Sequence, residues 1–435
     1  MMKRRTLITD CRFADGTAGW LLTKGRRIAA LGAGEAPSEE VDERVDARSA
    51  LLLPGMIDTH VHFREPGLTH KATIASESRA ALLGGVTSYL EMPNTKPATT
   101  SLAALEEKKA IAARDSAANY GFFLGASETN IGELRALDPR AVPGIKLFIG
   151  SSTGNMAVNS PEALDAIFEA ATVPVMVHAE DDEIIARRAA EARGRYGEDV
   201  PVAEHSAIRS QEACLTAAQR AIGLAKAHGK RLHIAHLTTA AELKAAESEP
   251  LVTTEVTPLH LTFDCGDYAR LGSRIKVNPA VKTPDDREEL RRALADGRIT
   301  TIGSDHAPHL LSEKEGGALK AASGAPSVQF ALPLLLTHFP AALVAEKYSA
   351  APARLFDIEG RGELRPGAYA DLVLMEECPP YTLTDSDSAS PCGWTPFAGR
   401  TLGWRVRDVW VNGTLAVSDG RLTGRTDAMP LVFDR

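Results

Sequence analysis

The sequence predicts an α/β protein in which a closed, TIM-like (β/α)8 barrel carries a small β-sandwich module built from both ends of the chain. Three observations lead to this prediction. Eight short apolar runs occur between residues 54 and 354, segments of helix length separate them, and strand and turn signals fill both flanks. The expected domains are a module at 1–53 plus 355–435 and a barrel at 54–354, which has the size of such barrels.

The first 50 residues contain short strands separated by the turn signals Asp15-Gly16 and Lys24-Gly25, as expected for half of a small β module. The chain then changes to near-continuous apolar runs, which are typical of parallel strands buried on both faces. These runs are Met56–Val61, Val86–Met92, Tyr120–Gly125, Gly144–Ile149, Val173–Val177, Leu232–Ala235, Leu251–Val256 and Ile299–Gly303.

Ala-, Glu- and Arg-rich segments such as Ser101–Ala118 and Asp286–Ala295 lie between the runs and predict the barrel helices. After about Leu355 the strand and turn signals return, with the hairpin dipeptide Asn412-Gly413 among them. Within this second flank, only Ser386–Pro396 resembles a flexible insertion.

Composition limits the classes of function. With 44% hydrophobic and 24% charged residues the chain is globular, which excludes a disordered or fibrous protein. The net charge of -8 and the lack of a basic run argue against nucleic acid as a partner. We recognise no signal peptide and no apolar span of bilayer length, so no membrane partner is expected. Five widely spaced cysteines indicate reduced thiols and a cytoplasmic location.

Polar side chains at the ends of the apolar runs indicate a metal centre. Active sites of such barrels form at the C-terminal ends of the strands. His60 and His62 end the first run two residues apart, so both imidazoles point to the same side. Later runs end in or carry Lys146, His178, His236 and Asp305. One such histidine is more often a core residue, but four at matching strand ends favour Zn²⁺ or a similar ion.

Lys146 lies inside the apolar run Pro143–Ile149, where its charge has no obvious route to solvent. Burial favours the neutral amine, which is a nucleophile. An ammonium group beside metal cations would be repelled, so reaction of the amine with CO₂ to an anionic carbamate is expected. Such a carbamate can bridge two metal ions about 3.5–4 Å apart. The alternative is a structural, ion-paired lysine.

Motifs at these positions resemble the amidohydrolase superfamily and, within it, the dihydroorotases. The motifs are Pro54–Gly67, Met92–Thr95, Gly144–Leu147, Val177–Glu180, Ile234–His236 and Gly303–His309. The resemblance covers nearly the whole chain. It implies two Zn²⁺ ions per subunit, one on His60, His62 and Asp305 and one on His178 and His236, bridged by carbamylated Lys146. Many relatives have a His-His pair where this chain reads Thr257-Pro258-Leu259-His260, so we favour a structural role for His260.

The expected substrate is a small anion. Arg64 follows His62 by two residues and should point into the same mouth, where a guanidinium is favourable only if an anion, such as a carboxylate, pairs with it. The resemblance implies that Arg64, Asn94 and His309 bind the carboxylate of dihydroorotate, and that Asn278 contacts its ring.

The implied reaction is the reversible hydrolysis of the cyclic amide of dihydroorotate to N-carbamoyl-L-aspartate, a step of pyrimidine biosynthesis. Two metal ions would lower the pKa of a bridging water toward 7, which supplies a metal-bound hydroxide. Asp305 would take the proton from the attacking hydroxide and give it to the departing ring nitrogen.

Two other functions remain open. A hydantoinase, dihydropyrimidinase or allantoinase would use the same barrel and metals, but its usual substrates lack the ring carboxylate that Arg64 and His309 would bind. An inactive scaffold on the same fold would typically have lost metal ligands. The sequence also predicts a lid at Gly150–Asn155 and structural roles for five further histidines, and it is compatible with a homo-oligomer. These histidines are His70, His205, His228, His233 and His338.

Overall fold

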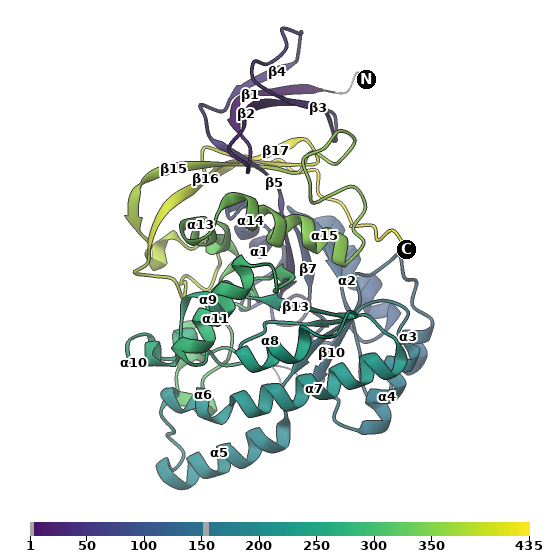
Figure 1. Cartoon of the computed structure of the whole chain (residues 1–435), viewed down its shortest axis with the longest axis vertical. Helices are drawn as coiled ribbons and strands as arrows, with labels where there is room; N and C mark the ends of the chain where they lie inside the picture. Colours follow the sequence, from purple (N-terminus) through teal and green to yellow (C-terminus); the bar gives the residue numbers. More distant parts are fainter. Residues whose placement is uncertain (1–3, 151–155) are drawn as a thin grey trace.

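A computed structural model describes residues 4–150 and 156–435 of the chain. Parallel strands form a barrel below a β-rich module that contains both flanks of the sequence (Figure 1). The barrel strands are β6 (Met56–Val61), β7 (Val86–Glu91), β8 (Asn119–Phe122), β9 (Leu124–Gly125), β10 (Ile145–Ile149), β11 (Val175–Ala179), β12 (Leu232–Ile234), β13 (Val252–Val256) and β14 (Thr301–Ile302). They pair in parallel with their neighbours, as the eight apolar runs predict.

Two junctions close the barrel. Strands β8 and β9 come from one predicted run, which Phe123 interrupts while its backbone N–H donates to the carbonyl of Glu91 (3.1 Å). At the other junction, a parallel bridge joins Val61 to His306, and the N–H of His62 donates to the His306 carbonyl (2.7 Å). The predicted (β/α)8 barrel is therefore confirmed, with its third strand broken in the middle.

Helices follow the strands and cover the barrel. The two segments expected to be helical contain α2 (Leu102–Asp115) and α11 (Pro284–Ala295), which the side chains of Ser101 and Thr283 cap at their N-termini. The other α-helices are α1 (Ile74–Leu83), α3 (Ile131–Arg135), α4 (Pro161–Ala170), α5 (Asp182–Tyr196), α6 (His205–Ile208), α7 (Gln211–His228), α8 (Ala240–Ala246), α9 (Pro258–Thr262), α10 (Tyr268–Leu271), α12 (Gly317–Lys320), α13 (Val328–His338), α14 (Ala341–Ala345) and α15 (Ala351–Leu355). Within the described residues, no helix combines the length and the apolar character that crossing a membrane requires.

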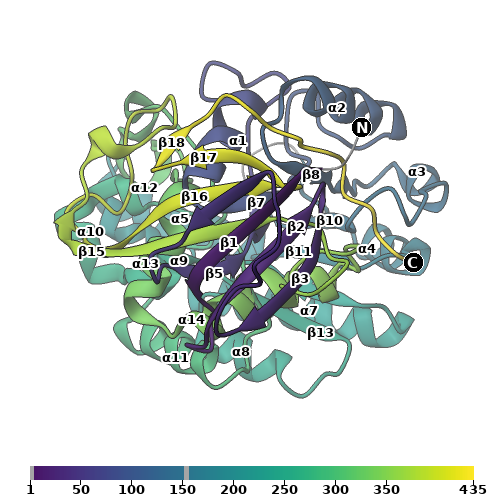
Figure 2. The ribbon, with the colours of Figure 1, turned by 90° about the horizontal axis from the view of Figure 1, so that it is seen from above.

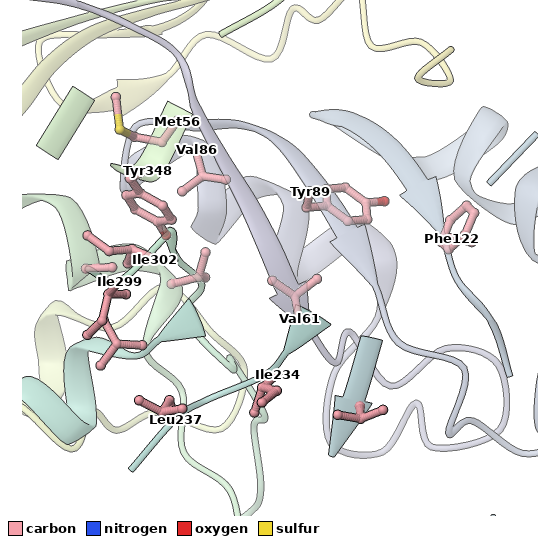
Figure 3. Close-up of a cluster of buried hydrophobic side chains, with 14 of the residues drawn as sticks. Met56, Val61, Val86, Tyr89, Phe122, Ile234, Leu237, Ile299, Ile302 and Tyr348 are labelled. Atoms are coloured by element: carbon pink, nitrogen blue, oxygen red, sulfur yellow. The ribbon is translucent and has the colours of Figure 1, made fainter. Parts of the chain in front are cut away.

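Large apolar side chains fill the space inside the barrel and between strands and helices. Figure 3 shows Val61 and Ile234 converging from different strands, and Tyr348 lying beside Ile302. Each fully buried side chain of this size stabilises the fold by about 1.5–3 kcal/mol. The strand ends that carry the polar residues are therefore held by a rigid scaffold.

The module at the ends of the chain is one sheet in the order β18-β17-β16-β15-β5-β1-β2-β3, with β4 paired to β1. Its strands are β1 (Arg5–Arg12), β2 (Ala18–Lys24), β3 (Arg27–Ala33), β4 (Glu43–Asp46), β5 (Leu51–Pro54), β15 (Leu372–Thr382), β16 (Thr401–Val411), β17 (Thr414–Ser418) and β18 (Arg421–Leu422). Seen from above, this sheet lies across the barrel, with strands from both chain ends side by side (Figure 2). Asn412 and Gly413 form the expected hairpin with positive φ angles of 49° and 77°.

The connection between β15 and β16, residues 383–400, packs against the barrel. Its Trp394 is 0% exposed and belongs to a buried cluster with Phe263, Val277 and Phe330. The interpretation of Ser386–Pro396 as a flexible insertion is therefore wrong. Its Ser and Pro content is typical of loops, but its apolar side chains find partners in segments more than 50 residues away.

Candidate metal centre and anion subsite

Three predicted ligands meet at the C-terminal end of β6. The ligand atoms of His60, His62 and Asp305 lie within 4.8 Å of one another, which fits one divalent ion. The Nε2 atoms of His60 and His62 lie 3.4 and 3.1 Å from Asp305 Oδ1. All three side chains are largely buried, so a cation between them would be shielded from solvent.

Hydrogen bonds fix the orientation of both imidazoles. His60 Nδ1 donates to Glu255 Oε1 (2.8 Å), and His62 Nδ1 donates to Asn94 Oδ1 (2.7 Å). This tautomer leaves each Nε2 lone pair directed at Asp305, which is the arrangement of metal-binding histidines. Burial, together with the charge of Lys146, lowers the pKa of His60 to about 4, so its ring is neutral at pH 7.

A second set of predicted ligands lies directly beside the first. The ring of His236 is 5.2 Å from that of His60 and 4.8 Å from that of His178. Lys146 is fully buried, and its Nζ has no hydrogen-bond partner among the described residues. The Nδ1 atom of His236 likewise lacks one. Burial lowers the pKa of Lys146 to about 8, which favours the neutral amine. These unsatisfied buried atoms fit residues that a metal centre would complete.

Three residues of the site adopt a left-handed backbone conformation. The φ angles are 69° at Arg64, 39° at His236 and 47° at Asp305. Residues other than glycine rarely adopt such angles, and where they do the strain gathers at functional sites. Each of the three follows a barrel strand directly or within three residues, so the turn aims the side chain.

Arg64 and His309 form a buried cationic subsite next to the metal ligands. Arg64, which is 3% exposed, donates from Nε to the carbonyl of Pro308 (3.0 Å), and its Nη2 contacts Nε2 of His309 (3.0 Å). Burial lowers the pKa of Arg64 to about 10, so the guanidinium stays charged at neutral pH. The charges of Asp305 and Glu91 attract the guanidinium from a distance, but among the described residues Arg64 has no carboxylate partner at ion-pair distance. Strand β6 already ends at Val61, so Arg64 owes its direction to its left-handed turn rather than to strand alternation.

Asn278, which is predicted to contact the substrate ring, has an unsatisfied side-chain atom. Asn278 is half-buried, and its Oδ1 has no hydrogen-bond partner among the described residues, so it can accept from a ligand N–H.

The expected lid begins at Gly150, but residues 151–155 lie outside the described residues. Lys71, which no sequence motif indicated, also reaches the anion subsite: its Nζ lies 3.1 Å from Nδ1 of His309 and forms an ion pair with Glu313 (2.8 Å).

Four of the histidines expected to be structural, His260, His205, His228 and His233, have hydrogen-bond partners of their own. Both ring nitrogens of His260 are engaged, by Thr257 Oγ1 (2.8 Å) and the Pro279 carbonyl (3.0 Å). His205 bonds to the Val277 carbonyl (2.9 Å), His228 to Asp165 (2.7 Å) and His233 to Thr253 (2.9 Å). These contacts agree with structural roles.

Sequence reasoning missed two carboxylates that support the ligands. Besides His60, Glu255 on β13 accepts from the backbone N–H of His236 (3.3 Å), so it orients parts of both ligand sets. Glu180 lies 3.0 Å from Nε2 of His178 and pairs with Arg209. Glu255 stands near the end of the seventh apolar run. A carboxylate at the end of a buried strand is a sequence signal that could have revealed its role.

Comparison with known proteins gives a consistent result. The amidohydrolase family model matches residues 51–416. The curated dihydroorotase of Halobacterium salinarum is 37% identical over 429 residues, which cover 95% of this chain and 99% of that protein. The dihydroorotase of Methanosarcina mazei is 33% identical and covers 87% of this chain and 88% of its own length.

The solved structures similar to this chain include hydantoinases. The L-hydantoinase (dihydropyrimidinase) from Arthrobacter aurescens has a TM-score of 0.93 at 27% identity, with 99% of this chain and all 100% of that chain covered. The D-hydantoinase from Thermus sp. has a TM-score of 0.88 at 22% identity and shares the fold.

Proposed function

This chain belongs to the amidohydrolase family, and on that premise we propose that it is a dihydroorotase. It would interconvert dihydroorotate and N-carbamoyl-L-aspartate by hydrolysis and re-formation of a cyclic amide, as a step of pyrimidine biosynthesis. The dihydroorotases of H. salinarum and M. mazei, at 37% and 33% identity, support this assignment.

The observation that carries the proposal is the buried guanidinium of Arg64 beside His309. A buried cation without a carboxylate partner is costly unless a ligand supplies the negative charge. The ring carboxylate of dihydroorotate supplies it, and the fork of the guanidinium suits that group. Hydantoin and dihydrouracil have the cyclic amide but no carboxylate.

A hydantoinase is the second candidate function, because the L-hydantoinase of A. aurescens shares nearly the entire fold at a TM-score of 0.93. The two functions require the same barrel and the same metal ligands. They differ at the subsite of Arg64 and His309, where a neutral ring leaves the guanidinium unpaired. The subsite therefore favours the anionic substrate.

We infer that the cofactor is a pair of Zn²⁺ ions held by imidazole nitrogens and oxygen ligands. The residues that would hold them are His60, His62, Lys146, His178, His236 and Asp305. The neutral amine of Lys146 would add to CO₂, which forms an N–C bond and releases one proton, and the anionic carbamate would supply oxygen ligands to the metal ions. Bound divalent ions polarise a carbonyl group and lower the pKa of water toward 7.

The side chains of this chain bind the substrate and move the proton. Arg64 and His309 bind the carboxylate, and Asn94, which holds His62 at 2.7 Å, lies beside this subsite. Asn278 accepts a ring N–H through its Oδ1. Asp305 takes the proton from the attacking water and passes it to the ring nitrogen that leaves. Burial raises the pKa of Asp305, which makes it a stronger base for the first of these transfers.

One set of assays tests the proposal. Purified protein is supplied with dihydroorotate, dihydrouracil, hydantoin and allantoin, and zinc in the same sample is measured by mass spectrometry. We expect a kcat/KM for dihydroorotate that exceeds the others by at least a hundredfold, with about two zinc ions per chain. Faster turnover of hydantoin or dihydrouracil would establish the second candidate. No turnover of any compound by zinc-loaded protein would refute both.

The same proposal places the enzyme in the cytoplasm, where its substrate is made, and leaves room for a homo-oligomer. Light scattering at several concentrations measures the oligomeric state directly.

A further inference from the structure

The connection between β15 and β16 reaches from the β module to the rim of the active site. In Figure 1 the two strands extend along one side of the barrel, next to α13. Arg274 bonds to the Thr395 carbonyl (3.1 Å), and Gln329 of α13 bonds to both the Asp387 carbonyl (2.9 Å) and the N–H of Ala389 (2.7 Å). The connection is thus fixed to the barrel at several points.

Trp394 joins this connection to the anion subsite. Its indole Nε1–H donates to the backbone carbonyl of His309 at 2.7 Å, and the side chain is fully buried. The cations of Arg274 and Lys314 lie 5.1 and 5.8 Å from its ring centroid, within the range of cation–π attraction. These contacts hold the indole in one orientation.

Two consecutive carbonyls of the subsite are therefore held from different sides. Arg64 Nε donates to the Pro308 carbonyl (3.0 Å), and Trp394 Nε1 donates to the His309 carbonyl. A hydrogen bond to the carbonyl fixes the plane of its peptide group. It thereby also fixes the position of the His309 backbone, from which the side chain extends. Gly324 packs closely against this segment, since a Cβ there would lie 2.8 Å from the Ala307 carbonyl oxygen and 3.0 Å from Cδ2 of His309.

We propose that Trp394 is a positioning residue for the anionic end of the substrate, which acts through His309. Its side chain contacts the His309 carbonyl, Arg274 and Lys314, none of which is a proposed metal ligand. Its hydrogen bond sets where the imidazole of His309 lies relative to Arg64, and thereby the fit of a carboxylate between them. This inference rests on the proposed function, and it makes the β module a structural part of the substrate site.

The test uses Trp394→Phe, which keeps an aromatic ring and removes the indole N–H. We expect the KM for dihydroorotate to rise about tenfold, equivalent to about 1.4 kcal/mol, while kcat, zinc content and the KM for dihydrouracil stay unchanged. Trp410→Phe is the matched control, because Trp410 is a buried tryptophan of the same module that packs in a different cluster. KM does not depend on the fraction of folded protein, so partial misfolding leaves this readout intact.

A second variant separates positioning from general stability. In a His309→Ala background Trp394→Phe should change the KM for dihydroorotate less than twofold, since the residue through which it acts is gone. The same tenfold increase in that background, or an equal rise for dihydrouracil, would overturn the inference.

Hydrogen exchange gives a readout that needs no turnover. Trp394→Phe should accelerate exchange in peptides that cover residues 305–311, and Trp410→Phe should leave them unchanged. If the wild-type enzyme hydrolyses no dihydroorotate, the proposed function fails, and exchange alone decides whether Trp394 holds the segment. Unchanged exchange in Trp394→Phe would refute that role.

Discussion

Replacement of Arg64 by methionine tests the anion subsite most directly. Methionine keeps much of the length and apolar contact of the side chain and removes the charge. In the structure the guanidinium uses Nε for the Pro308 carbonyl and Nη2 for His309, and its remaining N–H groups provide a two-pronged contact for a carboxylate. We therefore expect Arg64→Met to weaken dihydroorotate binding and to leave the metal ligands in place.

The size of the effect follows from the contacts that are lost. A hydrogen bond to a charged group contributes about 1.5–3 kcal/mol, so two of them contribute about 3–6 kcal/mol. The variant recovers part of this, because the free enzyme no longer buries a charge. An expected loss of about 3 kcal/mol corresponds to a KM for dihydroorotate raised about 150-fold.

The assay compares substrates with and without the carboxylate. We expect the KM for dihydrouracil to change less than threefold in Arg64→Met. Arg407→Met is the control, because Arg407 is buried to a similar degree, 4% exposed against 3%, and bonds to Asp408 and the Ala47 carbonyl in the β module. Equal changes in KM for both substrates in Arg64→Met, or a change below threefold for dihydroorotate, would show that Arg64 does not select the anion.

Three further predictions concern the metal centre and the surrounding barrel. Glu255→Gln should lower zinc affinity about 10- to 100-fold, because the amide cannot accept from both Thr59 and His60; competition with a chelator measures this, and unchanged affinity would argue against an orienting role. Protein prepared under ¹³CO₂ should show a carbamate carbon resonance that is missing in Lys146→Gln, and a spectrum without it in the wild type would contradict the bridging ligand. Burial lowers the pKa of Lys276 from 10.5 to about 8, so between these pH values the unfolded chain binds more protons and stability rises with pH, by up to about 3 kcal/mol. Urea unfolding at pH 7.5 and 10 should show this gain reduced in Lys276→Met, and an identical gain in both proteins would refute the assignment.

The barrel could be predicted from sequence because its strands are buried on both faces. Each strand then appears as an apolar run, and the regular alternation of side chains brings His60 and His62 to one side. The break at Phe123 could not be predicted, since its run Tyr120–Gly125 is as apolar as the others. It depends on how the backbone bends to close the barrel.

Site residues that follow strands could be predicted from the sequence. Residues whose role depends on a partner far away in the sequence could not. His178, His236 and Asp305 stand at strand ends, so sequence position alone placed them. Glu255 acts by orienting His60, which lies 195 residues away in the sequence. Trp394 acts through its hydrogen bond to the carbonyl of His309, 85 residues away. Arg64 was expected beside the metal ligands from strand alternation, whereas in the structure a left-handed turn after β6 sets its direction.

The position of β5 between β1 and β15 has a consequence for synthesis of the chain. All four residues of β5 are buried, yet its antiparallel partner β15 follows it by more than 300 residues. A nascent chain that has left the ribosome as far as the barrel carries β5 with one unsatisfied edge, which invites pairing with other chains. The edge of β5 that pairs with β15 is satisfied only after translation has passed β15, so β5 reaches its native pairing long after it has been made.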